Sequence, residues 1–226
     1  MVRQDFLWDG GPCFFFDTDL FAPSTDSFAL GYFAAPKNGE SVCDLGCGTG
    51  LLGTLLLARN GTLALHNVEL QGDAMVLAER TFAANGWAAE WYRGDLRDVL
   101  PSAGTMDYAL CNPPYFKAGS GASALDSSRR AAREETTCTL DDVCAAAGRV
   151  LRWGGRFALV YRPERLVDLF CTLRANGMEP KRLRFVQSGD VPSLVLVEAR
   201  RGGKAGLIIE PPLVVGSAEW DKVYFR

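Results

Sequence analysis

The sequence predicts an α/β fold in which a mostly parallel sheet carries helices on both faces. Short apolar runs rich in β-branched and aromatic residues alternate with longer segments of helical periodicity, the pattern of parallel strands joined by helical crossovers. A glycine-rich loop follows the first of these strands and opens a helix at Leu51. A later strand ends at Cys111 and is followed at once by Asn112 and two prolines. Both features lie at carboxyl ends of strands, where open parallel sheets bind their ligands.

The expected elements follow one another in a regular order. Strands are predicted at 42–45, 63–70, 89–93, 108–111, 156–161, 182–187 and 194–199, and helices at 51–59, 73–85, 140–151 and 164–176. Gly154 and Gly155 are expected to end a helix and begin the next strand, and Asn176-Gly177 to cap the last long helix. Residues 188–193 leave no room for a helix, so the last two strands should pair antiparallel as a hairpin at one edge.

One domain is expected to hold most of the chain. A length of 226 residues and a hydrophobic content of 48% are enough for one good core, which we place at 41–201. Residues 1–40 are aromatic and rich in Asp, and are expected to form a helical or irregular cover over the carboxyl edge of the sheet. Residues 202–226 are expected to be a C-terminal extension packed on the same domain. Residues 117–135 are polar and lack periodicity, so they should form a loop beside the strand exit at Asn112.

Composition limits the classes of function. No apolar stretch approaches the roughly 18 residues that a membrane helix needs, so a soluble, cytoplasmic protein is expected. The seven cysteines form no Cys-x-x-Cys pair and are expected to be reduced packing residues. His66 is the only histidine and lies in an apolar run, which argues against a His-based metal site or a Ser/His/Asp triad. We therefore expect no metal.

The formal charge of −3 hides an asymmetry along the chain. Residues 1–113 contain six Lys or Arg against fourteen Asp or Glu, whereas residues 114–226 contain eighteen against thirteen. A local phosphate-binding surface would explain a basic C-terminal half in an acidic protein. Solvent-exposed helix faces rich in Lys and Arg would explain it equally well. Charge alone leaves both interpretations open.

The loop Asp44-Leu45-Gly46-Cys47-Gly48-Thr49-Gly50 connects the first predicted strand to the helix at Leu51. Its glycines allow the backbone to approach a ligand closely at the carboxyl edge of the sheet. Their spacing differs from the dinucleotide fingerprint, and Asp44 lies two residues before the first glycine. An acid in that place would serve a diphosphate poorly, so we expect a cationic or zwitterionic ligand.

Two further acids follow the next two strands. Glu69 ends the second strand, where a carboxylate can accept both hydroxyls of a ribose. Asp95 follows the third strand and is placed to meet the exocyclic amine of an adenine. With their neighbours Leu70 and Leu96, these acids predict a pocket for an adenosyl group with an attached positive charge.

The tetrapeptide Asn112-Pro113-Pro114-Tyr115 follows the strand that ends at Cys111. Two prolines remove two backbone donors and fix φ at about −65°, so the chain leaves the strand rigidly. A planar amine placed here would meet the Asn112 side chain as an acceptor and the Tyr115 ring as a stacking face. The same four residues could also form a rigid strand exit with no catalytic role, so the tetrapeptide alone does not establish a function.

Together these motifs resemble the class I S-adenosylmethionine-dependent methyltransferases. The resemblance covers roughly residues 24–201, with 44–50 as the first motif, Glu69 as the ribose acid, Asp95 as the adenine-side acid and 112–115 as the fourth motif. It implies a Rossmann-like, seven-stranded, mostly parallel sheet whose last strand is antiparallel. It also implies S-adenosyl-L-methionine as cofactor, S-adenosyl-L-homocysteine as its product, and a catalytic role for Asn112, Pro113, Pro114 and Tyr115.

Within this family the chain is similar to the bacterial methyltransferases that modify an adenine N6 in the anticodon loop of valine tRNA. The similarity rests on Thr25-Asp26 before the glycine loop and on an arginine-rich segment, 129–134, after the tetrapeptide. It implies that Thr25, Asp26, Gly46, Cys47, Gly48, Gly50 and Asn112 join the three acids in binding the cofactor. It also implies that Tyr115, Arg129, Arg130 and Arg133 bind the substrate. Those relatives tend to be more basic overall than this chain.

These inferences predict an N-methyltransferase that acts on the exocyclic N6 amine of an adenine in RNA. The expected partner is tRNA, and the protein is expected to be a monomer. A glutamine amide of a protein is an alternative acceptor, because the tetrapeptide also resembles that of the release-factor methyltransferases. Those enzymes usually carry a separate helical N-terminal domain. DNA adenine methylation and a catalytically silent, cofactor-binding partner subunit are further alternatives. A solvated loop, with Glu134 and Glu135 as partners, would equally explain the three arginines.

Overall fold

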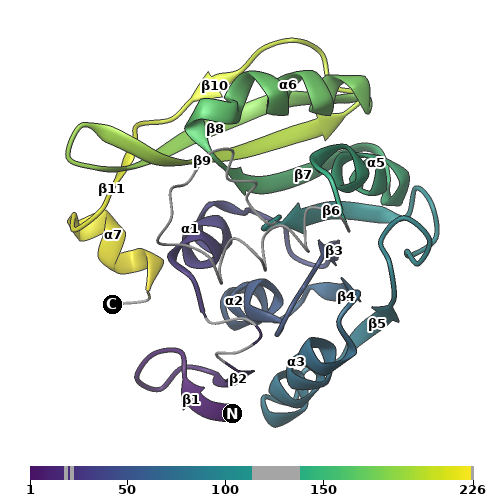
Figure 1. Ribbon diagram of the computed structural model, residues 1–226, viewed down its shortest axis with the longest axis vertical. Helices are drawn as coiled ribbons and strands as arrows, with labels where there is room; N and C mark the ends of the chain where they lie inside the picture. Colours follow the sequence, from purple (N-terminus) through teal and green to yellow (C-terminus); the bar gives the residue numbers. More distant parts are fainter. Residues whose placement is uncertain (18–19, 21–22, 114–137, 225–226) are drawn as a thin grey trace, which may run out of the picture.

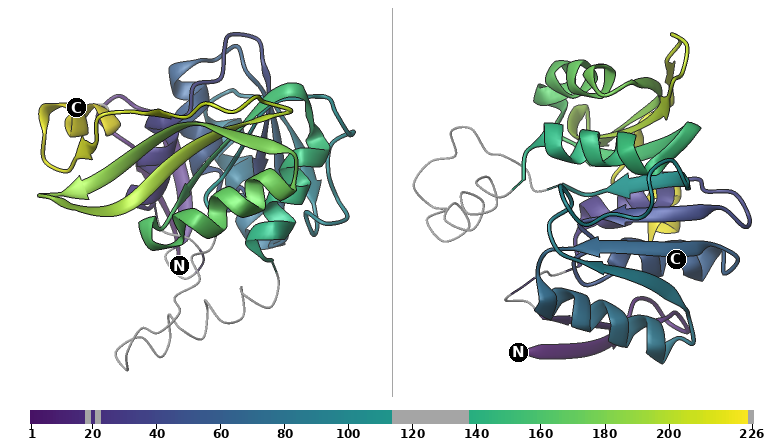
Figure 2. Two further views of the ribbon diagram at one scale, coloured as in Figure 1. Left: turned by 90° about the horizontal axis from the view of Figure 1, so that it is seen from above. Right: turned by 90° about the vertical axis from the view of Figure 1, so that its right-hand side faces the viewer.

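A large mixed sheet with helices on both faces forms the body of the protein in the computed structural model, which describes residues 1–17, 20, 23–113 and 138–224 (Figure 1). The sheet has nine strands in the order β10-β8-β9-β7-β6-β3-β4-β5, and β11 also pairs with β8. One apolar core lies between the sheet and α1, α2 and α7, and a second lies between the sheet and α5 and α6. Figure 2 shows these layers from two further sides.

The main sheet is built from β3 (Ser41–Leu45), β4 (Ala64–Glu69), β5 (Ala89–Arg93), β6 (Met106–Cys111), β7 (Leu151–Tyr161), β8 (Met178–Ser188), β9 (Val191–Arg201), β10 (Ile208–Ile209) and β11 (Leu213–Val214). The helices are α1 (Thr25–Phe33), α2 (Leu51–Arg59), α3 (Gly72–Ala84), α5 (Leu140–Val150), the short 3₁₀ helix η1 (Pro163–Arg165), α6 (Leu166–Ala175) and α7 (Ala218–Val223). A separate hairpin consists of β1 (Val2–Phe6) and β2 (Cys13–Asp17).

The predicted α/β class and the Rossmann-like sheet are confirmed. Strands β7, β6, β3, β4 and β5 pair parallel with their neighbours, while β9 lies antiparallel between β7 and β8. The last two predicted strands do form an antiparallel hairpin. Its outer strand, β8, is extended by the short parallel strands β10 and β11, which have too little periodicity to be predicted.

The start of β7 differs from the prediction. The helix before it ends at Val150, and Leu151 already belongs to the strand. The pairing of β7 with β6 shifts register between Met106 and Tyr108, which pair with Leu151 and Arg156. Gly154, with φ of 78°, lies inside this irregularity. The two glycines therefore shape a bulge within the strand instead of ending the helix.

The expectation of a helical or irregular cover at residues 1–40 is wrong for the first part of the chain. Residues 2–17 contain the β1-β2 hairpin, which packs on α3 rather than over the carboxyl edge of the sheet (Figure 1). Cys13 and Asn85 exchange two hydrogen bonds of 3.0 and 2.7 Å between their backbone and amide groups. Every residue of β1 is exposed, so this strand shows no alternation that would reveal it in the sequence.

The C-terminal segment packs on α1. The Tyr32 hydroxyl donates to Glu219 Oε1 at 3.2 Å, and Arg184 forms an ion pair with Glu219 at 2.7 Å. The rings of Phe28 and Tyr224 lie with centroids 4.7 Å apart. These contacts fix α1 between the sheet and α7, while the boundaries at 40/41 and 201/202 stay predictions.

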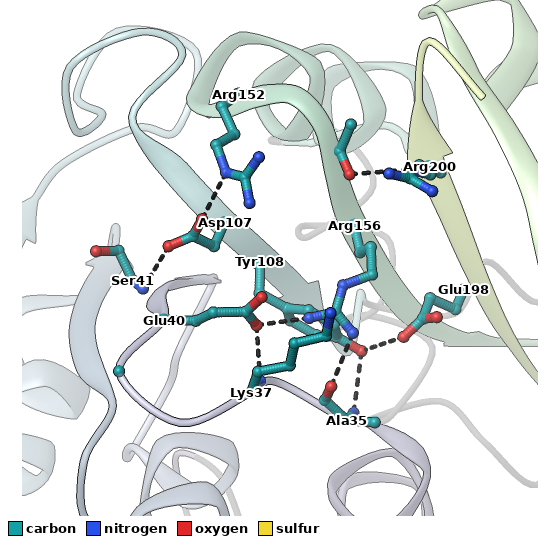
Figure 3. A network of polar contacts seen from close by, with 12 residues as sticks. Ala35, Lys37, Glu40, Ser41, Asp107, Tyr108, Arg152, Arg156, Glu198 and Arg200 are labelled. Atoms are coloured by element: carbon teal, nitrogen blue, oxygen red, sulfur yellow. Dashed lines mark hydrogen bonds and ion pairs between the residues drawn. The ribbon is translucent and has the colours of Figure 1, made fainter.

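A polar network at the amino-terminal edge of the sheet holds the end of α1 (Figure 3). The buried Tyr108 hydroxyl donates to Glu198 Oε2 at 2.8 Å and accepts from the Ala35 N–H at 3.3 Å. The Arg156 guanidinium lies 4.7 Å from the centre of the Tyr108 ring and pairs with Glu40 at 2.5 Å. Tyr108 therefore ties three separate segments to the middle of the sheet.

Replacing Tyr108 by Phe is predicted to lower the free energy of unfolding by about 1–3 kcal/mol, because the buried Glu198 carboxylate and the Ala35 N–H each lose a partner. Urea denaturation measures the change. Tyr92→Phe, which removes the hydroxyl 3.4 Å from His66 Nδ1, is the control and should cost less. Equal losses in the two variants would contradict a special role for the Tyr108 hydroxyl.

Candidate functional site

A cavity of about 340 Å³ opens at the carboxyl edge of the sheet. It is bounded by the start of α1, the ends of β3, β4 and β6, the turn after β5 and the start of α5. The predicted residues that line it are Asp26, Gly46, Glu69, Leu70, Asp95, Leu96, Asn112 and Pro113. The glycine loop, the strand exit at Asn112 and the two acids Glu69 and Asp95 therefore meet at one cavity.

The glycine loop is held against β4 by its backbone. Gly46 and Cys47 donate their N–H groups to the Val68 carbonyl at 2.9 and 3.0 Å. Gly46, Gly48 and Gly50 have φ of 74°, 55° and 82°, a region that residues with a Cβ rarely adopt. A Cβ on Gly50 would also lie 2.9 Å from the Ala78 Cβ of α3. The loop thus needs glycine both for its shape and for helix packing.

Glu69 fixes the loop from the end of β4. Its Oε2 accepts the Gly48 N–H at 2.8 Å, and its Oε1 accepts the Gln71 N–H at 2.7 Å. The side chain is buried, with 6% of its surface exposed. A carboxylate has about four acceptor positions, so these two bonds are compatible with acceptance of ligand hydroxyls.

Asp44 lies under the loop rather than in the lining of the cavity. It is fully buried, and among the described residues neither of its oxygens has a hydrogen bond of ordinary geometry. Burial, followed by the charge of Glu69, raises its pKa from 3.8 to about 7, and the Gly53 N–H acts in the opposite direction. Asn67, its register partner on β4, is likewise buried without such a bond. The negative charge here is therefore poorly compensated.

Asp95 is held by a residue that the sequence analysis missed. Arg97 donates through Nε to Oδ1 at 2.9 Å and through Nη2 to Oδ2 at 2.5 Å. These side-chain hydrogen bonds lower the pKa of Asp95. Opposite charges two residues apart were the available signal for this pair. Asp95 is consequently a fixed, ionised acceptor at the cavity.

Asn112 reaches the cavity from the end of β6 and is oriented by α1. Its Nδ2 donates to the Ser27 Oγ at 2.9 Å. Ser24, the N-cap of α1, also lines the cavity and contacts the same hydroxyl, with 3.1 Å between the two Oγ atoms. The prediction placed Asn112 correctly at this edge and overlooked both serines.

The other predicted residues lie elsewhere. Thr25, Asp44, Cys47, Gly48 and Gly50 are outside the lining set, and the Thr25 hydroxyl is 3.2 Å from the Tyr224 hydroxyl. Burial raises the pKa of the Cys47 thiol, which favours a neutral packing side chain. Pro114, Tyr115, Arg129, Arg130 and Arg133 lie outside the described residues.

Several lining residues carried no sequence signal. They are Leu45, Val68, Gln71, Gly94, Cys111, Cys138 and Val143. In residues 1–17, 20, 23–113 and 138–224, no cluster of three or more His, Cys, Asp or Glu is arranged to hold a metal ion. Within the same ranges, no helix is long and apolar enough to cross a membrane.

Comparisons with known proteins agree with this arrangement. Residues 28–168 match the family model described as methyltransferase small domain. A protein of Dickeya chrysanthemi named tRNA1(Val) (adenine(37)-N6)-methyltransferase is 32% identical over 188 residues, covering 80% of this chain and 73% of the relative. A protein of the same name from Parabacteroides distasonis is 29% identical over 161 residues, covering 70% and 67%.

Two solved structures share the fold. One is described as a predicted O-methyltransferase from Agrobacterium tumefaciens, with a TM-score of 0.69 and 18% identity, covering 88% of this chain and 95% of the other. The second is a putative class I S-adenosylmethionine-dependent methyltransferase from Listeria monocytogenes, with a TM-score of 0.64 and 11% identity, covering 92% and 70%. At these identities the likeness shows the fold alone.

The raised pKa of Asp44 predicts a dependence of stability on pH. Between about pH 4 and the folded pKa of about 7, the folded chain keeps a proton that the unfolded chain has lost. The contribution of Asp44 to the free energy of unfolding therefore falls as the pH rises through this window, by on the order of a few kcal/mol. As the pH rises from about 5 to about 8, the free energy of unfolding of Asp44→Asn should therefore increase relative to that of the unchanged protein. Urea denaturation at both values measures this gain, and a constant difference would contradict it.

Proposed function

Because the chain belongs to the methyltransferase small domain family, we propose that it transfers a methyl group from S-adenosyl-L-methionine to the N6 amine of an adenine in tRNA. The names of the relatives give adenine 37 of tRNA1(Val) as the position to test first. One observation carries the proposal: Asn112 meets the glycine loop, Glu69 and Asp95 at a single cavity. S-adenosyl-L-homocysteine would be the product.

The residues at the cavity fit an adenosyl group with a positive charge. Glu69 lies where it would accept ribose hydroxyls, and Asp95, whose pKa is lowered, would accept from the amine of the adenine ring. The Gly46 backbone permits close approach, and Leu70 and Leu96 supply apolar walls. The poorly compensated Asp44 favours a cation above a diphosphate. When bound, S-adenosylmethionine would supply an electrophilic methyl group at its sulfonium.

The acceptor side follows from the end of β6. We place the target amine where the side-chain oxygen of Asn112 and the carbonyl of Pro113 each accept one of its N–H bonds. These two bonds favour a pyramidal nitrogen whose lone pair faces the methyl group. As the new N–C bond forms, the bond from sulfur to the methyl carbon would break, and the cationic nitrogen would then lose a proton to solvent, so no strong base is needed first. Orientation of two reactants alone is worth about 7–11 kcal/mol of the barrier.

Residues outside the described part complete the proposal. Tyr115 would stack on the target base, a contact worth about 1–3 kcal/mol, with Pro114 keeping the exit rigid. Arg129, Arg130 and Arg133 would contact phosphates next to the target. The base would have to be swung out of its stack to reach Asn112. Action on tRNA by a monomer in the cytoplasm is part of the same proposal.

No observation on the described residues favours glutamine methylation, DNA methylation or a silent subunit. The direct test is mass spectrometry of nucleosides from tRNA of cells that lack this enzyme, before and after treatment with the purified protein and S-adenosylmethionine. Appearance of N6-methyladenosine is expected. Absence of any methylated nucleoside, with labelled methyl groups transferred to a protein instead, would overturn the tRNA assignment.

Asn112→Ala is predicted to lower kcat by about 10²–10³, the cost typical for loss of a positioned polar group that acts on the transition state. Binding of S-adenosylmethionine, measured by calorimetric titration, should persist. Asn60→Ala, at the end of α2, is the control and should leave kcat unchanged. Loss of the binding heat in Asn112→Ala would instead make Asn112 a cofactor or folding residue.

A triple replacement of Arg129, Arg130 and Arg133 by Ala is predicted to weaken tRNA binding and to reduce its salt dependence. For each phosphate that an arginine no longer neutralises, the slope of log K against log salt should fall by about 0.7–0.9. A triple Ala variant of the exposed residues Arg3, Lys204 and Lys222 has the same net charge and is the control. Equal slopes in the two variants would contradict phosphate binding by the 129–133 segment.

A further inference from the structure

The orientation of the Asn112 amide depends on α1. An Asn side chain ends in an oxygen and a nitrogen of similar size, so its hydrogen-bond partners decide which of the two faces a given direction. In this protein the nitrogen donates to Ser27 Oγ at 2.9 Å. Ser27 stands in the first turn of α1 and has 9% of its surface exposed. The two residues are 85 positions apart in the chain.

The Ser27 hydroxyl is itself held in place. Ser24 Oγ donates to Ser27 Oγ at 3.1 Å, and the Ser27 N–H donates to Ser24 Oγ at 3.3 Å as the N-cap bond of α1. A hydroxyl oxygen has two lone pairs. Ser24 takes one of them, and the other accepts the Asn112 N–H. The position of the Ser27 oxygen that accepts from Asn112 is thus set by the start of the helix.

We propose that Ser27 is a positioning residue, whose hydroxyl accepts the Asn112 N–H and thereby turns the Asn112 oxygen toward the amine that is to be methylated. The proposal rests on the proposed function, since it assigns the part that Ser27 plays in that reaction. In the reversed orientation the Asn112 nitrogen would face the amine, and two donors would meet. Ser27 does not touch the reacting atoms and acts only through Asn112.

Removal of the hydroxyl leaves the helix start intact. The N-cap bond of α1 uses the Ser27 backbone N–H and the Ser24 side chain, so Ser27→Ala keeps it. What the variant loses is the acceptor for the half-buried Asn112 amide and for the Ser24 hydroxyl. A hydrogen bond between neutral groups typically changes an equilibrium by about tenfold, and that sets the size of the expected effect.

The kinetic test compares Ser27→Ala, Ser27→Thr and Tyr32→Phe at saturating tRNA and S-adenosylmethionine. We expect kcat of Ser27→Ala to fall about tenfold while calorimetric titration gives an unchanged Kd for S-adenosylmethionine. Ser27→Thr keeps the acceptor and should recover most of kcat. Tyr32→Phe removes a hydroxyl of the same helix that bonds to Glu219, away from the cavity, and should leave kcat unchanged.

A double-mutant cycle separates positioning from general packing. If Ser27 acts through Asn112, Ser27→Ala causes no further loss of kcat in the Asn112→Ala background. A wild-type kcat for Ser27→Ala, a further loss in that background, or a rise in Kd that matches the fall in kcat would each overturn the proposal.

The side-chain amide signals of Asn112, assigned with Asn112→Ala, give a second and independent readout by NMR. One amide proton should exchange slowly with solvent in the unchanged protein and quickly in Ser27→Ala. Equal exchange rates would show that Ser27 does not hold the amide. Should the unchanged protein methylate no tRNA, the proposed function fails, and the amide exchange still decides whether Ser27 orients Asn112.

Discussion

Parallel pairing of β3 with β4 and β6 is the constraint on which the candidate site depends. Asp44 pairs in register with Asn67 on one side and with Leu110 on the other, so the three strands end at one edge of the sheet. The glycine loop, Glu69 and Asn112 follow those ends directly. A slip of one residue would turn every side chain of a strand to the opposite face. Because side chains of β3 and β6 pack in both cores, such a slip would disrupt the close packing on each face.

The electrostatics of this edge set it apart from an ordinary core. Glu69 is held by backbone N–H groups and Asp95 by Arg97, whereas Asp44 is fully buried and has no hydrogen bond of ordinary geometry in the described part of the chain. Burial of a carboxylate without a partner favours its neutral form, which is why the pKa of Asp44 rises to about 7. A cation bound in the cavity would lower this cost. The site is therefore less stable than a packed apolar edge would be, and a cationic ligand would supply part of the missing compensation.

Residues at strand ends were predictable and contacts between distant segments were not. Glu69 and Asn112 follow apolar runs whose limits are visible in the sequence, and general rules place strand ends at one edge. Thr25 and Asp26 were predicted together, but successive residues of a helix point about 100° apart. Asp26 therefore lines the cavity while the Thr25 hydroxyl faces Tyr224. Ser27 and the β1 hairpin were missed because their partners, Asn112 and α3, lie far away along the chain.

The segments that hold α1 and β6 contact each other at both edges of the sheet. At the amino-terminal edge the Tyr108 hydroxyl accepts the Ala35 N–H, and at the carboxyl edge Ser27 accepts from Asn112. From Ser27 to Phe33 the helix rises about 9 Å, the chain leaves the helix at Ala34 before it reaches Ala35, and four residues of strand rise about 13 Å. The Tyr108–Glu198 network in Figure 3 and the Ser27–Asn112 contact therefore hold α1 and the residues just after it against the same strand.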